Sequence, residues 1–209
     1  YGDWSSDVCS SDLLHPSAWS FVQGRASAVV MFAIPLLAFA LAAVFLIDDV
    51  RGLPVPVRFG VQLAAAAIFV WGSSRNYPWL LMPCLVLGIV WSANLYNFMD
   101  GSNGLAGGMA VAGFGAYAVA ALQAGGDGQI AMMCAVMAGA AAGFLVWNFG
   151  RAIIFLGDAG SIPLGFLAAV IGVIGWERGV WPFWLPLLVF SPFVVDACVT
   201  LVQRWRRGE

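Results

Sequence analysis

The chain has 209 residues, of which 62% are hydrophobic and only 10% are charged, with a formal net charge of −2. Soluble domains carry roughly 25% charged residues, so this composition excludes an ordinary soluble globule and predicts an integral membrane protein. No basic patch interleaved with aromatic residues occurs, so we expect no nucleic acid among the partners.

The first thirteen residues, YGDWSSDVCSSDL, are polar and rich in Ser and Asp, unlike everything that follows. They lack the basic and apolar regions of a signal peptide, and they resemble translated sequencing-adaptor read-through. The other end stops at LVQRWRRGE, directly after an apolar segment. We therefore expect residues 1–13 to be a non-native artefact and residues 14–209 to be one transmembrane domain, truncated at both ends.

Seven apolar segments approach the length of about 20 residues that a membrane-spanning helix needs. In chain order they lie near 28–47, 58–72, 78–98, 104–122, 129–149, 161–176 and 181–203. Ala, Gly and Leu dominate them, and small residues are typical of helix contacts in lipid. The expected fold class is all-α, a polytopic transmembrane helix bundle of about seven spans embedded in the lipid bilayer.

The basic residues, all of them Arg, predict the orientation of this bundle. With alternating spans, one side collects Arg51, Arg58, Arg151, Arg204, Arg206 and Arg207, and the other collects Arg25, Arg75 and Arg178. Because positive residues favour the cytoplasmic side, we expect the first side to face the cytoplasm.

Carboxylates gather where spans end on that same side. Asp48 and Asp49 end the first span in FLIDDVRGLPVPVR. Asp100 ends the third span in NLYNFMDGSNG, and Asp158 lies in NFGRAIIFLGDAGS, between the fifth and sixth. One such loop would be an ordinary helix end, since Asp and Asn favour caps and turns. Three of them at one membrane surface indicate a shared site.

A cation would offset the repulsion among these carboxylates, which is about 4 kcal/mol for unit charges ~4 Å apart at an effective dielectric near 20. Mg²⁺ fits because it takes oxygen ligands and bridges one or two carboxylates to substrate phosphates; Mn²⁺ is the alternative. No cluster of Cys and His favours zinc. Arg51, Arg58 and Arg151 supply guanidinium groups that match phosphate oxygens. Glycines in DGSNGLAGG and GDAGS precede helix N-termini, which attract anions. The pattern predicts a phosphorylated substrate at this surface.

Three of these motifs, FLIDDVRGLPVPVRFGVQ, NLYNFMDGSNGLAGG and FLGDAGSIPLGF, resemble the polyprenyl-phosphate N-acetylhexosamine-1-phosphate transferases of glycosyltransferase family 4 type. They occur in the family's order, and the resemblance runs over about residues 28–209. It implies a multi-pass enzyme of the bacterial inner membrane with a cytoplasmic active site. Such an enzyme transfers a hexosamine 1-phosphate from a UDP-N-acetylhexosamine to undecaprenyl phosphate, releases UMP and requires Mg²⁺. The wording NLYNFMDG is closer to the O-antigen and lipopolysaccharide branch than to the peptidoglycan branch.

The resemblance also implies roles for individual residues. Asp48 and Asp49 match the family's paired aspartates, one of which is the proposed base or organiser for the attacking lipid phosphate. Asn94, Asn97 and Asp100 match the Asn-rich motif that helps to position the nucleotide sugar.

Asp158 in GDAGS matches the family's metal-binding aspartate, and by their position Arg51 and Arg151 are expected to contact the pyrophosphate. The chain departs from the family at Asn103, where a second Asp is common; an amide can still bind the substrate through its carbonyl. It also lacks the family's leading spans and its His-containing cytoplasmic loop, so the chain as given is expected to bind weakly or to be inactive.

Several alternatives stay open. The chain could be a cation-coupled transporter or an inactive assembly subunit. A CDP-alcohol phosphatidyltransferase would show a DGxxAR…GxxxD…D run in a single segment, which this chain lacks. Transfer could be direct or pass through an aspartyl phosphate. Asp196, inside the last span, could have a structural or a catalytic role. The sequence does not identify the sugar, and a homodimer is one of several open oligomeric states.

Overall fold

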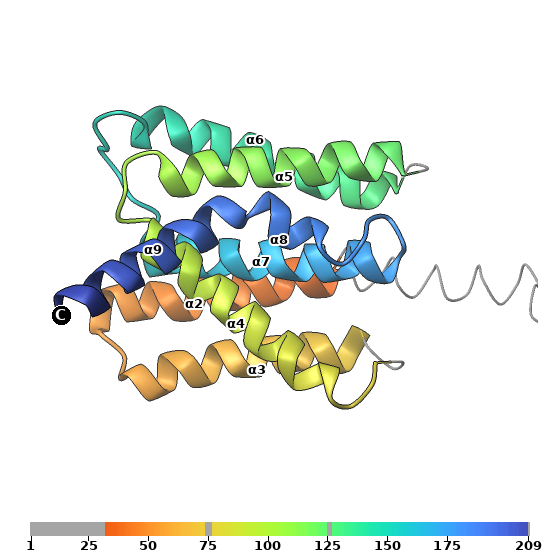
Figure 1. Cartoon of the computed structure of the whole chain (residues 1–209), viewed down its shortest axis with the longest axis horizontal. Helices are drawn as coiled ribbons and strands as arrows, with labels where there is room; N and C mark the ends of the chain where they lie inside the picture. Colours follow the sequence, from red (N-terminus) through yellow and green to blue (C-terminus); the bar gives the residue numbers. More distant parts are fainter. Residues whose placement is uncertain (1–31, 74–76, 125–126, 209) are drawn as a thin grey trace, which may run out of the picture.

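The computed structural model describes residues 32–73, 77–124 and 127–208, which are helical and contain no strand. Residues 1–13, Arg25 and Arg75 lie outside these ranges. The helices are α2 (Ile34–Arg51), α3 (Val55–Ser73), α4 (Leu81–Met99), α5 (Leu105–Gln123), α6 (Gly128–Asn148), α7 (Gly157–Glu177), α8 (Leu185–Val189) and α9 (Ser191–Arg207). The expected all-α bundle is therefore confirmed (Figure 1).

Five helices among the described residues, α3 to α7, are long and apolar enough to cross a membrane, fewer than the seven expected. Helix α2 has the length of a span, but its last turn carries Asp48, Asp49 and Arg51. The expected last span, 181–203, is interrupted at Phe190, where α8 ends and α9 begins. Pro192, in the first turn of α9, explains the break, because proline lacks the N–H that a continuous helix needs and clashes with the preceding turn.

Helix α7 occupies the centre of the bundle and packs along α2 on one side and α4 on another (Figure 1). Helices α5 and α6 form an antiparallel hairpin that packs mainly on itself. The crossing of α4 and α7 is very close at Gly165, where an added Cβ would lie 2.6 Å from the carbonyl oxygen of Ser92. The Ser92 hydroxyl also donates a 2.9 Å hydrogen bond to the Gly165 carbonyl. This contact fixes the position of α4 relative to α7.

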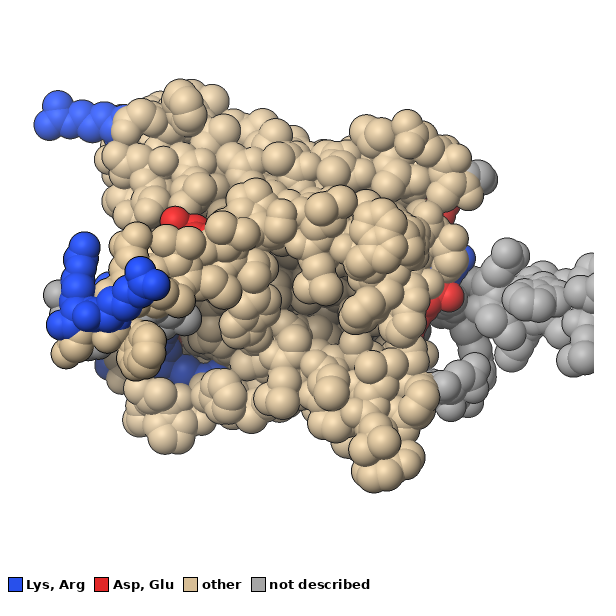
Figure 2. Space-filling view, in the orientation of Figure 1, with Lys and Arg blue, Asp and Glu red and all other residues tan. Residues whose placement is uncertain are grey.

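One end of the bundle collects the ends of α2, α4, α6 and α9 together with the starts of α3, α5 and α7, at the left in Figure 1. The six Arg residues assigned to one side by the sequence belong to these helix ends and their loops, and Figure 2 shows blue side chains gathered there. Arg178 lies at the opposite end, where it pairs with Asp127 at 2.7 Å. The charged loops therefore separate by side as the alternation of spans predicts.

Candidate active site

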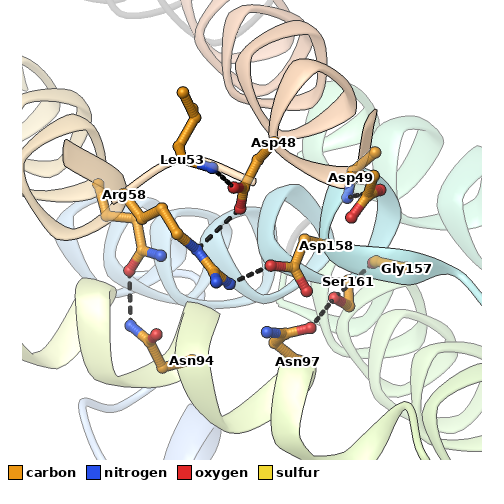
Figure 3. Close-up of polar contacts among 11 residues, drawn as sticks. Asp48, Asp49, Leu53, Arg58, Asn94, Asn97, Gly157, Asp158 and Ser161 are labelled. Atoms are coloured by element: carbon orange, nitrogen blue, oxygen red, sulfur yellow. Dashed lines mark hydrogen bonds and ion pairs between the residues drawn. The ribbon is translucent and has the colours of Figure 1, made fainter. Parts of the chain in front are cut away.

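The candidate site surrounds the N-terminus of α7, at the Arg-rich end of the bundle. Side chains reach it from the last turn of α2, the first turns of α3 and the end of α4, so that motifs far apart in the sequence meet (Figure 3). Asp48, Asp49, Asp100 and Asp158 all lie here, each in contact with α7 or with a residue bound to it. The convergence that the sequence predicts for these four carboxylates is present.

Arg58, in the first turn of α3, connects two of the carboxylates. Its Nε lies 2.8 Å from Asp48 Oδ2, in the geometry of an ion pair rather than of an aligned hydrogen bond. Its Nη2 donates to Oδ2 of Asp158 (Figure 3). Asp48 is buried, and its other oxygen accepts a 2.6 Å hydrogen bond from the backbone N–H of Leu53. Asp48 therefore binds the backbone of the α2–α3 loop with one oxygen and the guanidinium of Arg58 with the other.

The first turn of α7 receives the other two carboxylates. Gly157 N–H donates a 2.9 Å hydrogen bond to Asp100 Oδ2, and Ala159 N–H donates one of 3.2 Å to Asp49 Oδ2. These N–H groups have no partner within the helix and carry its partial positive charge, so anions are stabilised there. Gly157 has a φ of +65°, and an added Cβ would lie 3.0 Å from Asp49 Oδ2, so only glycine fits this position without strain.

Asp100 is the most unusual of the four in its electrostatics. Its side chain is buried, and Oδ1 has no hydrogen-bond partner among the described residues. Burial raises the pKa of Asp100 above its ordinary value, and the negative charge of Asp158 raises it further. Hydrogen bonds from the backbone N–H groups of Leu156 and Gly157 oppose both effects by stabilising the ionised form. A cation beside Asp100 would satisfy the free oxygen and favour the carboxylate.

The Asn residues of α4 face α3 and α7. Asn94 donates to Gln62 Oε1 at 2.5 Å and to the Val90 carbonyl at 2.7 Å. The Ser161 hydroxyl lies 2.8 Å from Asn97 Oδ1 and 2.7 Å from the Gly157 carbonyl oxygen, and it can donate its hydrogen bond to either of them. Each amide is therefore oriented by a polar partner on a neighbouring helix.

A second pair of amides ties two glycine-rich loops together beside the site. Asn148, fully buried at the end of α6, accepts a 2.8 Å hydrogen bond from Gly104 N–H and donates one of 2.8 Å to the Ile154 carbonyl. Asn103, which is exposed, donates a 2.9 Å hydrogen bond to the Gly150 carbonyl. The α4–α5 loop and the α6–α7 loop are thus held as one unit.

Replacing Asn148 by Ala is expected to lower the free energy of unfolding by about 2 kcal/mol, because Asn148 is fully buried and two backbone groups, the Gly104 N–H and the Ile154 carbonyl, lose their partner. Asn103→Ala, which removes one exposed hydrogen bond between the same loops, should cost less than about 1 kcal/mol. Unfolding titrations in mixed micelles would measure both values. Equal losses would show that burial of the Asn148 amide does not matter.

Other predicted site residues stand apart from this network. Arg51 and Arg151 are exposed, and the structure records no ion pair for either of them within the described residues. Asp196 is exposed on α9 and has no recorded polar partner there. No group of three or more Asp, Glu, His or Cys residues in the described part of the chain is close enough to form a metal cluster. Arg58 forms the ion pairs with Asp48 and Asp158.

Four residues of the network were not chosen from the sequence: Arg58 as a carboxylate partner, Gln62, Asn148 and Ser161. Three carried a readable signal in their spacing. Arg58 and Gln62 are four residues apart and share a face of α3, and Ser161 follows Asp158 by three residues, one helical turn. Asn148 gave no such signal, because its partners are backbone groups in loops.

Comparison with known proteins agrees with the motifs. The sequence model of glycosyl transferase family 4 matches residues 31–176. The chain is 31% identical over 189 residues to a probable undecaprenyl-phosphate N-acetylglucosaminyl 1-phosphate transferase of Bacillus subtilis, covering 83% of this chain and 52% of that protein. It is 28% identical over 208 residues to a phospho-N-acetylmuramoyl-pentapeptide-transferase of Listeria monocytogenes, covering 88% and 62%. Over 130 residues it is 40% identical to the Geobacillus kaustophilus protein of the same name, covering 62% and 38%.

The chain thus spans about half the length of the Bacillus subtilis relative and 62% of the Listeria relative. Five membrane-length helices within the described ranges, together with its bacterial relatives, identify a multi-pass bacterial membrane protein. Since the family model covers most of the chain, including every carboxylate of the site, the chain belongs to glycosyl transferase family 4.

Proposed function

We propose that this chain is the core of an enzyme that transfers an N-acetylhexosamine 1-phosphate from a UDP-sugar to undecaprenyl phosphate, with release of UMP. The reaction would begin a cell-envelope glycan, such as O-antigen or another lipopolysaccharide component. The site would lie on the cytoplasmic side of the inner membrane, because the Arg-rich loops gather at the same end of the bundle as the site.

The convergence of Asp48, Asp49, Asp100 and Asp158 on the α7 N-terminus is the observation that carries this proposal. A phosphoryl transfer between two anionic substrates needs positioned groups and compensation of charge more than covalent chemistry. The N-terminus of α7, Arg58 and the amides of α4 supply hydrogen-bond donors, while the carboxylates supply sites for a cation. At the end of the bundle, these groups would lie where a lipid phosphate and a soluble nucleotide meet.

The roles divide by environment. Asp49 is exposed beside the first turn of α7, and so it is the better placed of the aspartate pair to orient or deprotonate the lipid phosphate. Asp48 is buried in the last turn of α2 and acts through Arg58. Asn94 and Asn97, with Asn103 on the following loop, would bind the nucleotide sugar. Arg51 and Arg151, which are exposed, would contact its pyrophosphate.

The residues present fit a magnesium ion, with Mn²⁺ as a substitute. The donors are all oxygens, as Mg²⁺ prefers, and the buried Oδ1 of Asp100 has no hydrogen-bond partner among the described residues. Asp158 would hold the ion with Asp100, the substrate phosphates and water completing its shell. When bound, it would offset the charge of the phosphate groups. The described ranges contain no group of three or more Asp, Glu, His or Cys residues that could hold a metal. Mg²⁺ is usually bound by only one or two carboxylates, so it does not need such a group.

The placement of the carboxylates favours this function over a cation-coupled transporter. A transporter would hold ionisable groups near the middle of the bilayer, at broken helices. Here Asp196 is the single acidic residue of the interrupted pair α8 and α9, and the four clustered carboxylates lie at one end.

The direct test uses the full-length gene product that carries this chain, purified with undecaprenyl phosphate. UDP-GlcNAc, UDP-GalNAc and UDP-MurNAc-pentapeptide are supplied in turn, and UMP is measured. We expect UMP release that requires the lipid phosphate, and that one sugar nucleotide supports best. Release of no UMP with any of them would overturn the proposal.

A further inference from the structure

Arg58 occupies the position between carboxylates where a cation is expected. Figure 3 shows its guanidinium between Asp48 and Asp158, with an interaction to each. It is the one cation that forms ion pairs with the clustered carboxylates in the described part of the chain. Arg58 therefore compensates, within the protein itself, the charge that a bound metal would compensate.

The two ends of this bridge differ in their surroundings. The side chain of Asp48 is only 4% exposed, whereas that of Asp158 is 21% exposed and that of Arg58 is 33% exposed. Separating Arg58 from Asp48 would leave a buried carboxylate without its charge partner, which is costly. Separating it from Asp158 leaves a carboxylate that water can reach, and this costs less.

We propose that Arg58 is the counter-ion of Asp158 in the empty site. When a divalent cation binds Asp158, the ion pair between Arg58 and Asp158 breaks, while the ion pair between Arg58 and Asp48 remains. Cation and guanidinium then compete for one carboxylate, so that the site is held together when empty and is reorganised when loaded. This inference rests on the proposed function, because it assumes that Asp158 takes a metal.

The exchange would also give Arg58 a second use. Once Asp158 is engaged by the cation, the distal nitrogens of the guanidinium lose their partner and point into a site that binds phosphates. A planar guanidinium binds phosphate oxygens as readily as carboxylate oxygens. Arg58 is thus a phosphate-binding residue whose availability depends on the metal.

The first test measures the affinity for Mn²⁺ by electron paramagnetic resonance, without substrate. Arg58→Gln should bind Mn²⁺ at least about tenfold more tightly than the unaltered protein, because a positive charge that competes for Asp158 is removed. Arg51→Gln is the matched control: it removes the same charge from the same end, but Arg51 has no recorded ion pair within the described residues. Its Mn²⁺ affinity should change by less than about threefold.

Arg58→Lys covers the case in which the Gln variant does not fold. It keeps the charge but replaces the fork by a single ammonium that cannot hold both carboxylates in the same way. Its affinity for Mn²⁺ should lie between those of the unaltered protein and Arg58→Gln. An affinity for Mn²⁺ equal to or weaker than that of the unaltered protein would contradict the competition between Arg58 and the cation for Asp158.

The second test needs no variant. Modification by phenylglyoxal, mapped by mass spectrometry, reports how accessible each Arg is. Saturating Mn²⁺ should increase the modification of Arg58 and leave that of Arg51 unchanged. Protection of Arg58 by Mn²⁺, or no change, would overturn the inference.

The results also separate this inference from the function on which it rests. Equal Mn²⁺ affinity in the unaltered protein and Arg58→Gln overturns the counter-ion role and leaves the transferase proposal intact. Failure of both proteins to bind Mn²⁺ overturns the counter-ion role together with the assignment of a metal to Asp158. UMP release, measured separately, decides the reaction itself.

Discussion

Replacing Asp158 by Asn is expected to reduce UMP release by at least about 10³-fold, equivalent to about 4 kcal/mol in the activation free energy. The amide keeps the size of the side chain but removes the negative charge that would hold the cation. It also removes the charge partner of Arg58. Steady-state assays of the full-length gene product, with undecaprenyl phosphate and the preferred UDP-sugar, would measure the change.

Asp127→Asn provides the matched control for Asp158→Asn. Asp127 pairs with Arg178 and caps α6 at the other end of the bundle, so the same chemical change there should leave the rate within about twofold. Thermal unfolding of both variants establishes that each is folded. Turnover by Asp158→Asn at the unaltered rate would refute the assignment of the metal to this carboxylate.

Replacing Gly165 by Ala is expected to have the largest effect on the fold, a loss of about 2 kcal/mol or more in the free energy of unfolding. The new Cβ would lie 2.6 Å from the Ser92 carbonyl oxygen, 2.7 Å from Ala93 Cα and 2.8 Å from Tyr96 Cβ. Two of these atoms belong to the backbone, so α4 must move away from α7. Unfolding titrations in mixed micelles would detect the loss.

The same displacement should reach the active site. Helix α4 leads to Asp100 and carries Asn97, and α7 carries their partners Gly157 and Ser161. We therefore expect Gly165→Ala to lower kcat as well as stability. Gly139→Ala is the control, since an added Cβ there meets nothing within 4 Å and alanine favours the helix. Equal stability of the two variants would mean that the α4–α7 contact is not tight.

The sequence predicted the parts of this structure that follow from composition and spacing. Apolar length located α3 to α7 within a few residues, because a continuous helix in lipid needs little beyond an apolar stretch. The alternation of spans then placed Asp49, Asp100 and Asp158 at one end. The interruption at Phe190 was missed, since 181–203 is mostly apolar and Pro192 was not weighed as a helix breaker.

Pairing within the site was beyond the sequence. Four carboxylates suggested a metal as their common partner, but the motifs did not indicate that Arg58 joins Asp48 and Asp158. Which acid meets which base depends on how α2, α3 and α7 are rotated about their axes, and that follows from packing of the whole bundle. The buried Asn148 was also unpredictable, because backbone groups of distant loops are its partners.

The amide links of Asn148 and Asn103 have a consequence for how substrate preference could be altered. Since these hydrogen bonds join the loop after α4 to the loop after α6, neither loop can change its conformation without the other. An engineer who grafts one of these segments from a relative with another sugar would need to transplant both, along with the end of α6. A single graft should disturb the recipient's geometry rather than transfer the donor's selectivity.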